Sequence, residues 1–98
     1  MSVSYKSFKV IISKKSIKWI KFQSKAVQLQ ILEKLKTLVS DNFDSLDTKK
    51  LRGYDNLFRI RCGVYRIVYR PNNENKIIKV VVEHRRNIYN LIQNQTWS

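Results

Sequence analysis

The stretch that decides the fold is Leu57-Phe58-Arg59-Ile60-Arg61-Cys62-Gly63-Val64-Tyr65-Arg66-Ile67-Val68-Tyr69-Arg70, in which apolar and basic residues alternate around one glycine. Side chains of a strand point to alternate faces, so the basic residues near the turn share one face and the apolar residues share the other. Residues 63–64 have the length and composition of a two-residue hairpin turn. The sequence therefore predicts two antiparallel strands with one apolar face and one basic face.

The register of this hairpin brings arginines together. With a two-residue turn, Cys62 lies opposite Tyr65, and Arg61 lies directly opposite Arg66. Like charges directly across an antiparallel pair destabilise it by a few tenths of a kcal/mol to about 1 kcal/mol. A fold that keeps such an arrangement commonly uses it to bind an anion. We expect a polyphosphate to bind the face that carries these arginines together with Arg59.

The composition indicates the same class of partner. The chain has 98 residues, of which 43% are hydrophobic, and a formal net charge of +13. This length and hydrophobic content are typical of a single domain with one core, which we predict to span residues 1–98. The charge favours nucleic acid or another acidic partner over a small neutral ligand. A basic surface that serves only solubility is the alternative.

Residue counts exclude several classes of site. Because Cys62 is the single cysteine, an internal disulfide and a multi-cysteine zinc site are both excluded. Its place on the apolar face of the hairpin predicts that it is buried. The two glycines leave no glycine-rich phosphate loop, and no glycine lies among the acids of residues 41–48, which we expect to cap turns or offset lysines. We expect no metal and no cofactor. The apolar runs are too short for a membrane span, and the N-terminus is unlike a secretory signal, so we expect a cytoplasmic protein without a membrane partner.

The patterns outside the hairpin predict an α+β fold. Its other expected elements, in chain order, are a strand over residues 5–13, a helix capped by Ser13 or Ser16, a helix after a break near Ser24 whose core residues include Leu32, a turn over residues 71–75, a covered strand over residues 76–82 and a helix capped by Asn87. The order is β-α-α-β-β-β-α. We predict one small domain with a mainly antiparallel sheet, two N-terminal helices packed on one face, and a short C-terminal helix.

Any catalysis at the basic face has to rely on cations. The ribose 2′-OH of RNA can attack the adjacent phosphate if it is aligned and the developing charge is stabilised, and a guanidinium suits the second task. Arginine does not readily surrender a proton at neutral pH, so we seek the proton donor and acceptor among Glu83, His84, Tyr89 and nearby lysines. Each candidate also has a structural interpretation. Tyr89 can pack on the sheet, His84 can be an exposed strand end, and Glu83 can pair with a neighbouring arginine.

The chain resembles the RelE/ParE superfamily of bacterial toxins from type II toxin–antitoxin pairs. Three segments carry the resemblance: Lys49-Lys50-Leu51-Arg52-Gly53, the hairpin, and His84-Arg85-Arg86-Asn87-Ile88-Tyr89. They look like the family's leucine–glycine entry, its basic strand with a glycine–tyrosine–arginine hairpin, and its histidine–arginine–tyrosine ending. The resemblance implies the predicted fold. For the RelE branch it also implies cleavage of messenger RNA in the ribosomal decoding site and control by an antitoxin that wraps the toxin.

The resemblance also assigns site residues. Arg66 would contact the scissile phosphate, and the residues expected to be catalytic are Arg59, Arg61, Arg66, Arg85 and Tyr89, with His84 and Glu83 as further candidates. The cations expected to bind RNA are Lys49, Lys50, Arg52, Arg70 and Arg86. Several family members have lysines in place of Arg59 and Arg61. Because lysine can be tuned toward proton transfer and arginine scarcely can, this exchange preserves binding better than proton transfer.

Three functions remain open from the sequence. The first is a metal-independent, ribosome-dependent mRNA endoribonuclease that uses the 2′-OH and inhibits translation. The second is a ParE-like inhibitor of DNA gyrase, and the third is a degenerate toxin that only binds antitoxin or RNA. In every case we expect an acidic or amphipathic antitoxin as partner, and in the first case mRNA on the ribosome as well.

Overall fold

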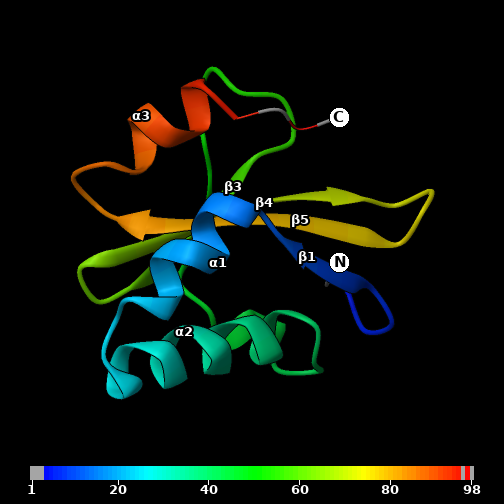
Figure 1. Cartoon of the computed structure of the whole chain (residues 1–98). Coiled ribbons are helices and arrows are strands. Elements are labelled where there is room, and N and C mark those ends of the chain that lie inside the picture. The colour runs from blue at the N-terminus through cyan, green and yellow to red at the C-terminus, as the bar shows by residue number, and fades with distance from the viewer. Residues whose placement is uncertain (1–3, 96, 98) are drawn as a thin grey trace.

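A mixed five-stranded sheet forms the centre of the molecule. The computed structural model describes residues 4–95 and 97. The strands are β1 (Lys9–Ile12), β2 (Thr48–Lys50), β3 (Phe58–Cys62), β4 (Tyr65–Asn72) and β5 (Ile77–His84). They lie in the order β1-β5-β4-β3-β2, with β1 parallel to β5 and the other neighbours antiparallel. The predicted α+β class with a mainly antiparallel sheet is confirmed (Figure 1).

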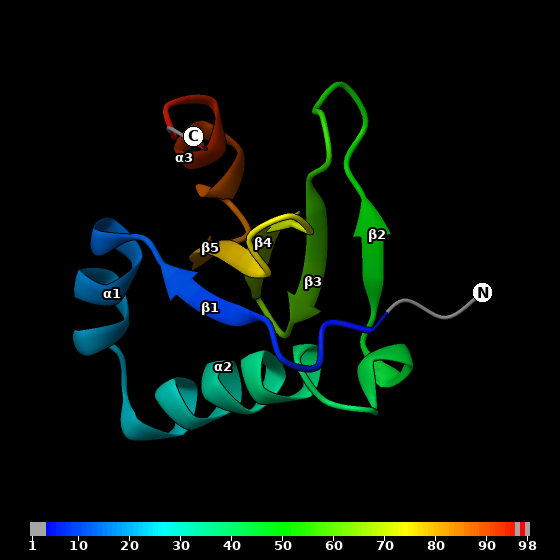
Figure 2. The ribbon, with the colours of Figure 1, turned by 90° about the vertical axis from the view of Figure 1, so that its right-hand side faces the viewer.

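Helices cover both faces of the sheet. They are α1 (Lys14–Lys21), α2 (Lys25–Leu38) and α3 (Ile88–Gln93), and a 3₁₀ helix, η1 (Phe43–Ser45), follows α2. As predicted, α1 and α2 pack together against one face, whereas α3 lies on the opposite side of the sheet (Figures 1 and 2). No helix within residues 4–95 and 97 is both long enough and apolar enough to cross a membrane.

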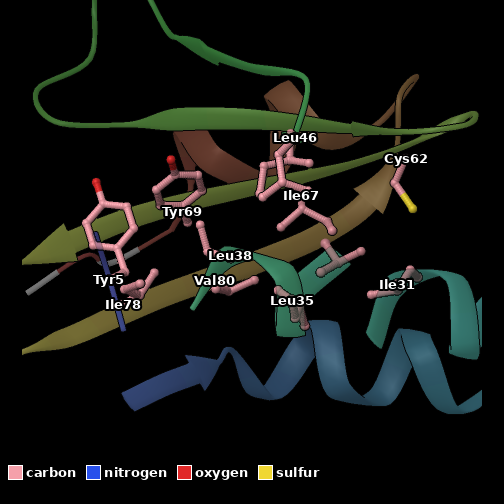
Figure 3. Packing of buried hydrophobic residues seen from close by; sticks show 12 residues of the cluster. Tyr5, Ile31, Leu35, Leu38, Leu46, Cys62, Ile67, Tyr69, Ile78 and Val80 are labelled. Carbon is pink, nitrogen blue, oxygen red and sulfur yellow. The ribbon is translucent and has the colours of Figure 1, made fainter. Parts of the chain in front are cut away.

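The main core lies between α2 and the sheet. Ile31, Leu35 and Leu38 recur at the spacing of one helical face, and all three are buried against the strands (Figure 3). Cys62, on the facing side of β3, is buried as predicted, and burial raises the pKa of its thiol while Lys34 and Arg66 oppose that rise. Cys62 is therefore packing material in the core, as its place on the apolar face of the hairpin indicates.

A second, smaller core lies under α3. Its buried members are Leu51, Leu57, Val68, Val81, Ile88 and Ile92. Val80 and Val82 of β5 face the main core, while Val81 between them faces this second one. A strand covered on both faces needs apolar residues at successive positions, which explains the nearly continuous apolar run of β5. The predicted covered position of this strand is confirmed.

The first strand is shorter than predicted. Residues 5–8 form a turn in which the backbone N–H of Phe8 donates to the carbonyl of Tyr5 at 2.9 Å, and Ser7 adopts a φ of 95°. This turn places Tyr5 in the main core, 5% exposed, in edge-to-face contact with Phe8, Phe43 and Tyr69. The alternation of residues 5–13 is therefore only partly that of a strand.

Two further strand boundaries differ from the prediction. The predicted order has no strand between the second helix and the hairpin, but residues 48–50 form β2 by pairing with residues 58–60 of β3. A short edge strand rich in lysine protects a sheet from unwanted pairing, and its own sequence carries little strand signal. At the other end, Pro71 and Asn72 belong to β4, where they pair with Ile78 and Ile77. Proline is tolerated there because β4 extends beyond its pairing with β3.

Two local predictions about helices were wrong. Leu32 was expected in the core but is 46% exposed. The inward face of α2 is already formed by Val27, Ile31, Leu35 and Leu38. Asn87 does precede α3, but its side chain makes no capping hydrogen bond, and its backbone carbonyl accepts from Leu91 instead. At the start of α1 the hydroxyl of Ser13 is the cap, which is one of the two predicted caps, and the hydroxyl of Ser24 caps α2 after the predicted break.

A serine hydroxyl satisfies the backbone hydrogen-bonding groups of β5 beyond the end of β1. β1 pairs with β5 only as far as Val80, so Val82 has no strand neighbour on that side. The hydroxyl of Ser16 accepts from the backbone N–H of Val82 at 2.8 Å and donates to its carbonyl at 3.2 Å. Ser16 is buried, and it therefore takes the place of a strand at this edge.

Replacing Ser16 with alanine should destabilise the fold, because both backbone groups of Val82 would lose a buried partner. We expect the free energy of unfolding to fall by about 2 kcal/mol in urea denaturation. Lys15→Ala, at an exposed position of the same helix, is the control and should change it by less than about 0.5 kcal/mol. Equal stability of the two variants would contradict this role of Ser16.

Candidate active site

The β3–β4 hairpin has the predicted register. Cys62 pairs with Tyr65, and Arg61 pairs with Arg66. Gly63 adopts a φ of 63°, whereas Val64 does not have a positive φ. A left-handed glycine at the first turn position is the pattern of a type II′ turn, whose twist matches that of the flanking strands. The glycine therefore holds the two arginines directly opposite each other.

The turn also orients the side chain of Arg66. Its Nη1 donates to the backbone carbonyls of Gly63 and Tyr65, each at 2.8 Å. These bonds fold the guanidinium back over the turn and fix its plane. Both bonds use Nη1, so they leave the donors of the other two guanidinium nitrogens, and Arg66 forms one wall of the adjacent cavity.

This cavity gathers cations from four parts of the chain. It has a volume of about 500 Å³. Its lining residues are Lys49, Lys50, Leu51, Arg52, Tyr54, Arg59, Arg61, Arg66, Arg85 and Tyr89. All five residues expected to be catalytic therefore lie around one space, together with three of the cations expected to bind RNA. Tyr54 is a lining residue that was not predicted from the sequence.

The cations repel one another. Burial, and then the charges of Arg61, Arg59 and Arg85, lower the pKa of Arg66 from its ordinary value. Opposite charge within the cavity favours the protonated guanidinium and relieves the repulsion between its neighbours. A phosphate oxygen matches this need because the guanidinium fork can donate two parallel hydrogen bonds to an anion. The cavity is thus suited to a phosphate group.

Arg59 lies deepest among these cations and is paired with Asp47. The residue is 9% exposed, and its Nη1 lies 3.6 Å from Oδ1 of Asp47. The other carboxylate oxygen of Asp47 lies 3.8 Å from Nη1 of Arg61, whose backbone N–H donates to the Asp47 carbonyl at 3.1 Å. Nη1 of Arg59 is buried without a hydrogen bond, so its contact with Asp47 is an ion pair only.

Asp47 is a site residue that the sequence analysis assigned to a general role in turns or near lysines. Its carboxylate instead lies beside two arginines, and its backbone is fastened to the same strand. The signal that could have found it is its position just before β2, which pairs with β3. Without knowledge of that strand pairing, the sequence does not bring Asp47 to the cavity.

The structure separates four predicted site residues from the cavity. Glu83, His84 and Arg86 line a different hollow of about 340 Å³, beside Trp19 and Tyr65. The carboxylate of Glu83 accepts from the backbone N–H of His84, and Nδ1 of His84 accepts from the backbone N–H of Arg86 at 3.1 Å. Arg70 lines a third cavity, near the β4–β5 turn, and lies 4.0 Å from Asp55.

Strand geometry explains the position of His84 but not that of Glu83, which pairs with Arg66 across β4 and β5 and whose carboxylate accepts from the backbone N–H of His84. His84 faces the same side of the sheet as Tyr65, with the two rings 6.0 Å apart, whereas the arginine cavity lies on the other side. After β5 the chain turns, and the backbone N–H of Arg85 donates to the carbonyl of Val64 at 2.8 Å. This bond brings Arg85 to the cavity, whereas its neighbour Arg86 lines the hollow beside His84.

Tyr89 reaches the cavity from the first turn of α3. Its neighbour Ile88 is buried in the second core, as is Ile92 one turn later. Tyr89 itself is 50% exposed. The buried residues anchor the helix and leave the tyrosine at the rim, so its phenol is accessible to a ligand in the cavity.

Comparison with known proteins gives the family. Residues 12–89 match the model of a family described as ParE toxin of type II toxin-antitoxin system, parDE. Toxin RelE3 of Methanocaldococcus jannaschii is 36% identical over 84 residues, which cover 83% of this chain and 94% of that toxin. The chain belongs to the RelE/ParE superfamily of type II toxins.

Solved structures of RelE toxins share the fold. The archaeal RelE–RelB complex of Pyrococcus horikoshii OT3 matches with a TM-score of 0.68 and 30% identity, over 81% of this chain and 96% of that one. The RelB–RelE antitoxin–toxin complex of Methanococcus jannaschii matches with a TM-score of 0.65 and 31% identity, over 81% and 94%. In both structures a RelE toxin is seen in complex with RelB. The resemblance drawn from the sequence is therefore confirmed at the level of family and fold.

Removing the charge of Asp47 should have two opposite effects in this RelE-family toxin. In Asp47→Asn, Arg59 loses its ionic partner, so the free energy of unfolding should fall by about 0.5–1 kcal/mol, a small change because the carboxylate is largely exposed. The affinity for inorganic pyrophosphate should rise several-fold, because an internal competitor for the arginines has been removed. Urea denaturation and calorimetric titration measure the two effects.

Asp44→Asn is the matched control, since it removes the same charge from an exposed position in the same segment. It should leave both quantities close to those of the wild type. If the two variants behave alike, the effect is one of net charge, and the specific role of Asp47 is wrong.

Proposed function

We propose that this RelE-family toxin is a metal-independent endoribonuclease that cleaves messenger RNA on the ribosome and so inhibits translation. The observation that supports the proposal is the convergence of Arg59, Arg61, Arg66 and Arg85 with Tyr89 around one cavity. This arrangement offers several guanidinium forks and one phenol to a single phosphate. Such an activity belongs in the cytoplasm, where ribosomes translate.

The reaction follows from the chemistry of RNA. The 2′-OH loses its proton and its oxygen attacks the neighbouring phosphorus, while the bond from phosphorus to the 5′ oxygen of the next nucleotide breaks and that oxygen gains a proton. The products are a 2′,3′-cyclic phosphate and a free 5′-OH. Alignment of the attacking oxygen and stabilisation of the charge that develops on the phosphate are the two tasks left to the protein.

The arginines suit the electrostatic task. Arg66 is already oriented by the turn, and Arg61 lies beside it, so the transition state can be stabilised without reorganising the guanidinium groups. Arginine is a poor proton carrier, and Tyr89 is the residue of the cavity that we propose for proton transfer at one of the two oxygens. Catalysis therefore relies chiefly on the positioning of cations.

Replacing Arg66 with alanine should remove the best-oriented of these cations. We expect cleavage to fall by about 100-fold or more, as is typical when one preorganised donor to a developing oxyanion is lost. The measurement is a map of transcript ends after induction of each variant in a bacterial host. Lys36→Ala, an exposed change on α2, is the control and should cleave as the wild type does.

The same experiment separates the second candidate function. The match of residues 12–89 to a ParE-type model favours inhibition of DNA gyrase, the activity that the resemblance implies for the ParE branch. Growth arrest with a DNA-damage response and no new transcript ends would support that function and overturn the nuclease proposal. Absence of toxicity at any level of expression would indicate a degenerate toxin that only binds its partners.

We also propose a cognate antitoxin as partner, because the relatives from Pyrococcus and Methanococcus are both seen in complex with RelB. A chain with a net charge of +13 is suited to an acidic or amphipathic segment, and the arginine cavity is the strongest local concentration of that charge described above. An antitoxin segment laid over the cavity would neutralise the cations and exclude RNA at the same time.

The affinity for this antitoxin should depend on salt. We expect the association rate and the affinity to fall as sodium chloride is raised from 50 to about 500 mM, because screening shortens the range of the attraction. Calorimetry or surface plasmon resonance on the purified pair measures this dependence. An affinity that does not change with salt would show that apolar contacts dominate the interface.

A further inference from the structure

One aromatic side chain at the cationic cavity has no part in the mechanism above. Tyr54 lies in the loop between β2 and β3, and both Tyr54 and Leu51 line the cavity that holds the arginines. The same two residues line a second, adjoining hollow of about 360 Å³, whose other walls are Lys50, Arg52 and Gly53. Tyr54 therefore lies between a cationic space and a smaller neighbouring one.

The loop that carries Tyr54 is held rigidly. Its ends are joined by a hydrogen bond of 2.9 Å from the backbone N–H of Leu51 to the carbonyl of Leu57. Gly53 and Asn56, on either side of Tyr54, have φ values of 80° and 57°, and the side-chain amide of Asn56 donates to the Pro71 carbonyl at 2.9 Å. Tyr54 is half-buried against the second core, so its ring is positioned before any ligand arrives.

A nucleotide has the same two-part character as this pair of spaces. Its phosphate requires cations, and its base presents a flat π-face that stacks on aromatic side chains. The arginine cavity supplies the first requirement, and Tyr54 with Leu51 supplies an aromatic and apolar surface directly beside it. The neighbouring Lys50 and Arg52 add charge for a flanking phosphate.

We propose that the hollow over residues 50–54 is a nucleobase subsite, in which the ring of Tyr54 stacks on the base of a nucleotide next to the phosphate held by the arginines. The inference rests on the proposed function, because both require RNA in the cavity. Stacking uses the face that all bases share, so this subsite adds affinity and alignment with little preference between bases.

The test measures binding of a short single-stranded oligoribonucleotide that carries a 2′-deoxy sugar at the cleavable position. A matched series replaces one base at a time with an abasic sugar. Tyr54→Phe keeps the ring and should bind as the wild type does, whereas Tyr54→Leu should bind about tenfold or more weakly. Phe22→Leu replaces an exposed aromatic residue that does not line the cavity, so it is the control and should bind normally.

Two comparisons assign the loss to the base. For one position of the missing base, the abasic oligonucleotide should bind the wild type as weakly as the intact oligonucleotide binds Tyr54→Leu. Removing that same base should weaken binding to Tyr54→Leu little further, because the stacking contact is already lost. Inorganic pyrophosphate, which has no base, should bind the wild type and Tyr54→Leu equally. Thermal melting checks that Tyr54→Leu is folded, and if it is not, the abasic series on the wild type still decides.

The failures are distinguishable. If Tyr54→Leu binds the intact oligonucleotide normally, or if no abasic position weakens binding to the wild type, the base subsite is wrong even where Arg66→Ala weakens binding. If the wild type does not bind the oligonucleotide while it binds pyrophosphate, the subsite fails together with the proposal that RNA occupies the cavity.

Discussion

The pairing of Arg61 with Arg66 across the β3–β4 turn is the constraint on which the rest of the site depends. A slip of β4 by one residue against β3 would turn Arg66 into the main core and expose Ile67, so burial of the apolar face fixes the register. On the opposite face, burial and then the repulsion that this register creates lower the pKa of Arg66. The hairpin thus uses the stability of one face to hold a charge arrangement on the other that is suited to an anion.

The two cores hold different parts of the cavity in place. The main core, between α2 and the sheet, sets the hairpin register, and the second core fastens the pieces that surround the arginines. Ile88 and Ile92 bring Tyr89 to the rim, while Leu51 and Leu57 hold the loop of Tyr54. Catalysis by positioned cations requires such preorganisation, because guanidinium groups that must move to reach the phosphate stabilise its transition state less.

What the sequence predicts well is local in origin. Alternation around Gly63 predicts the faces and register of the hairpin, and helical spacing predicts the inward residues of α2 apart from Leu32. What it misses depends on contacts between distant segments. β2 exists because β3 pairs with it, and Asp47 reaches two arginines through that pairing. Adjacency to Arg85 suggested that His84 and Glu83 join the site, but both line a separate hollow.

The most direct test of the account observes the guanidinium groups themselves. In the folded protein with ¹⁵N-labelled arginine, the side-chain resonances are followed during titration with a single-stranded oligoribonucleotide blocked by a 2′-deoxy sugar. The account predicts that the resonances of Arg61, Arg66 and Arg85 shift together and saturate with one common affinity, while those of Arg70 and Arg86 move little. Shifts confined to Arg70 and Arg86, with no change at Arg66, would contradict a phosphate site at the hairpin.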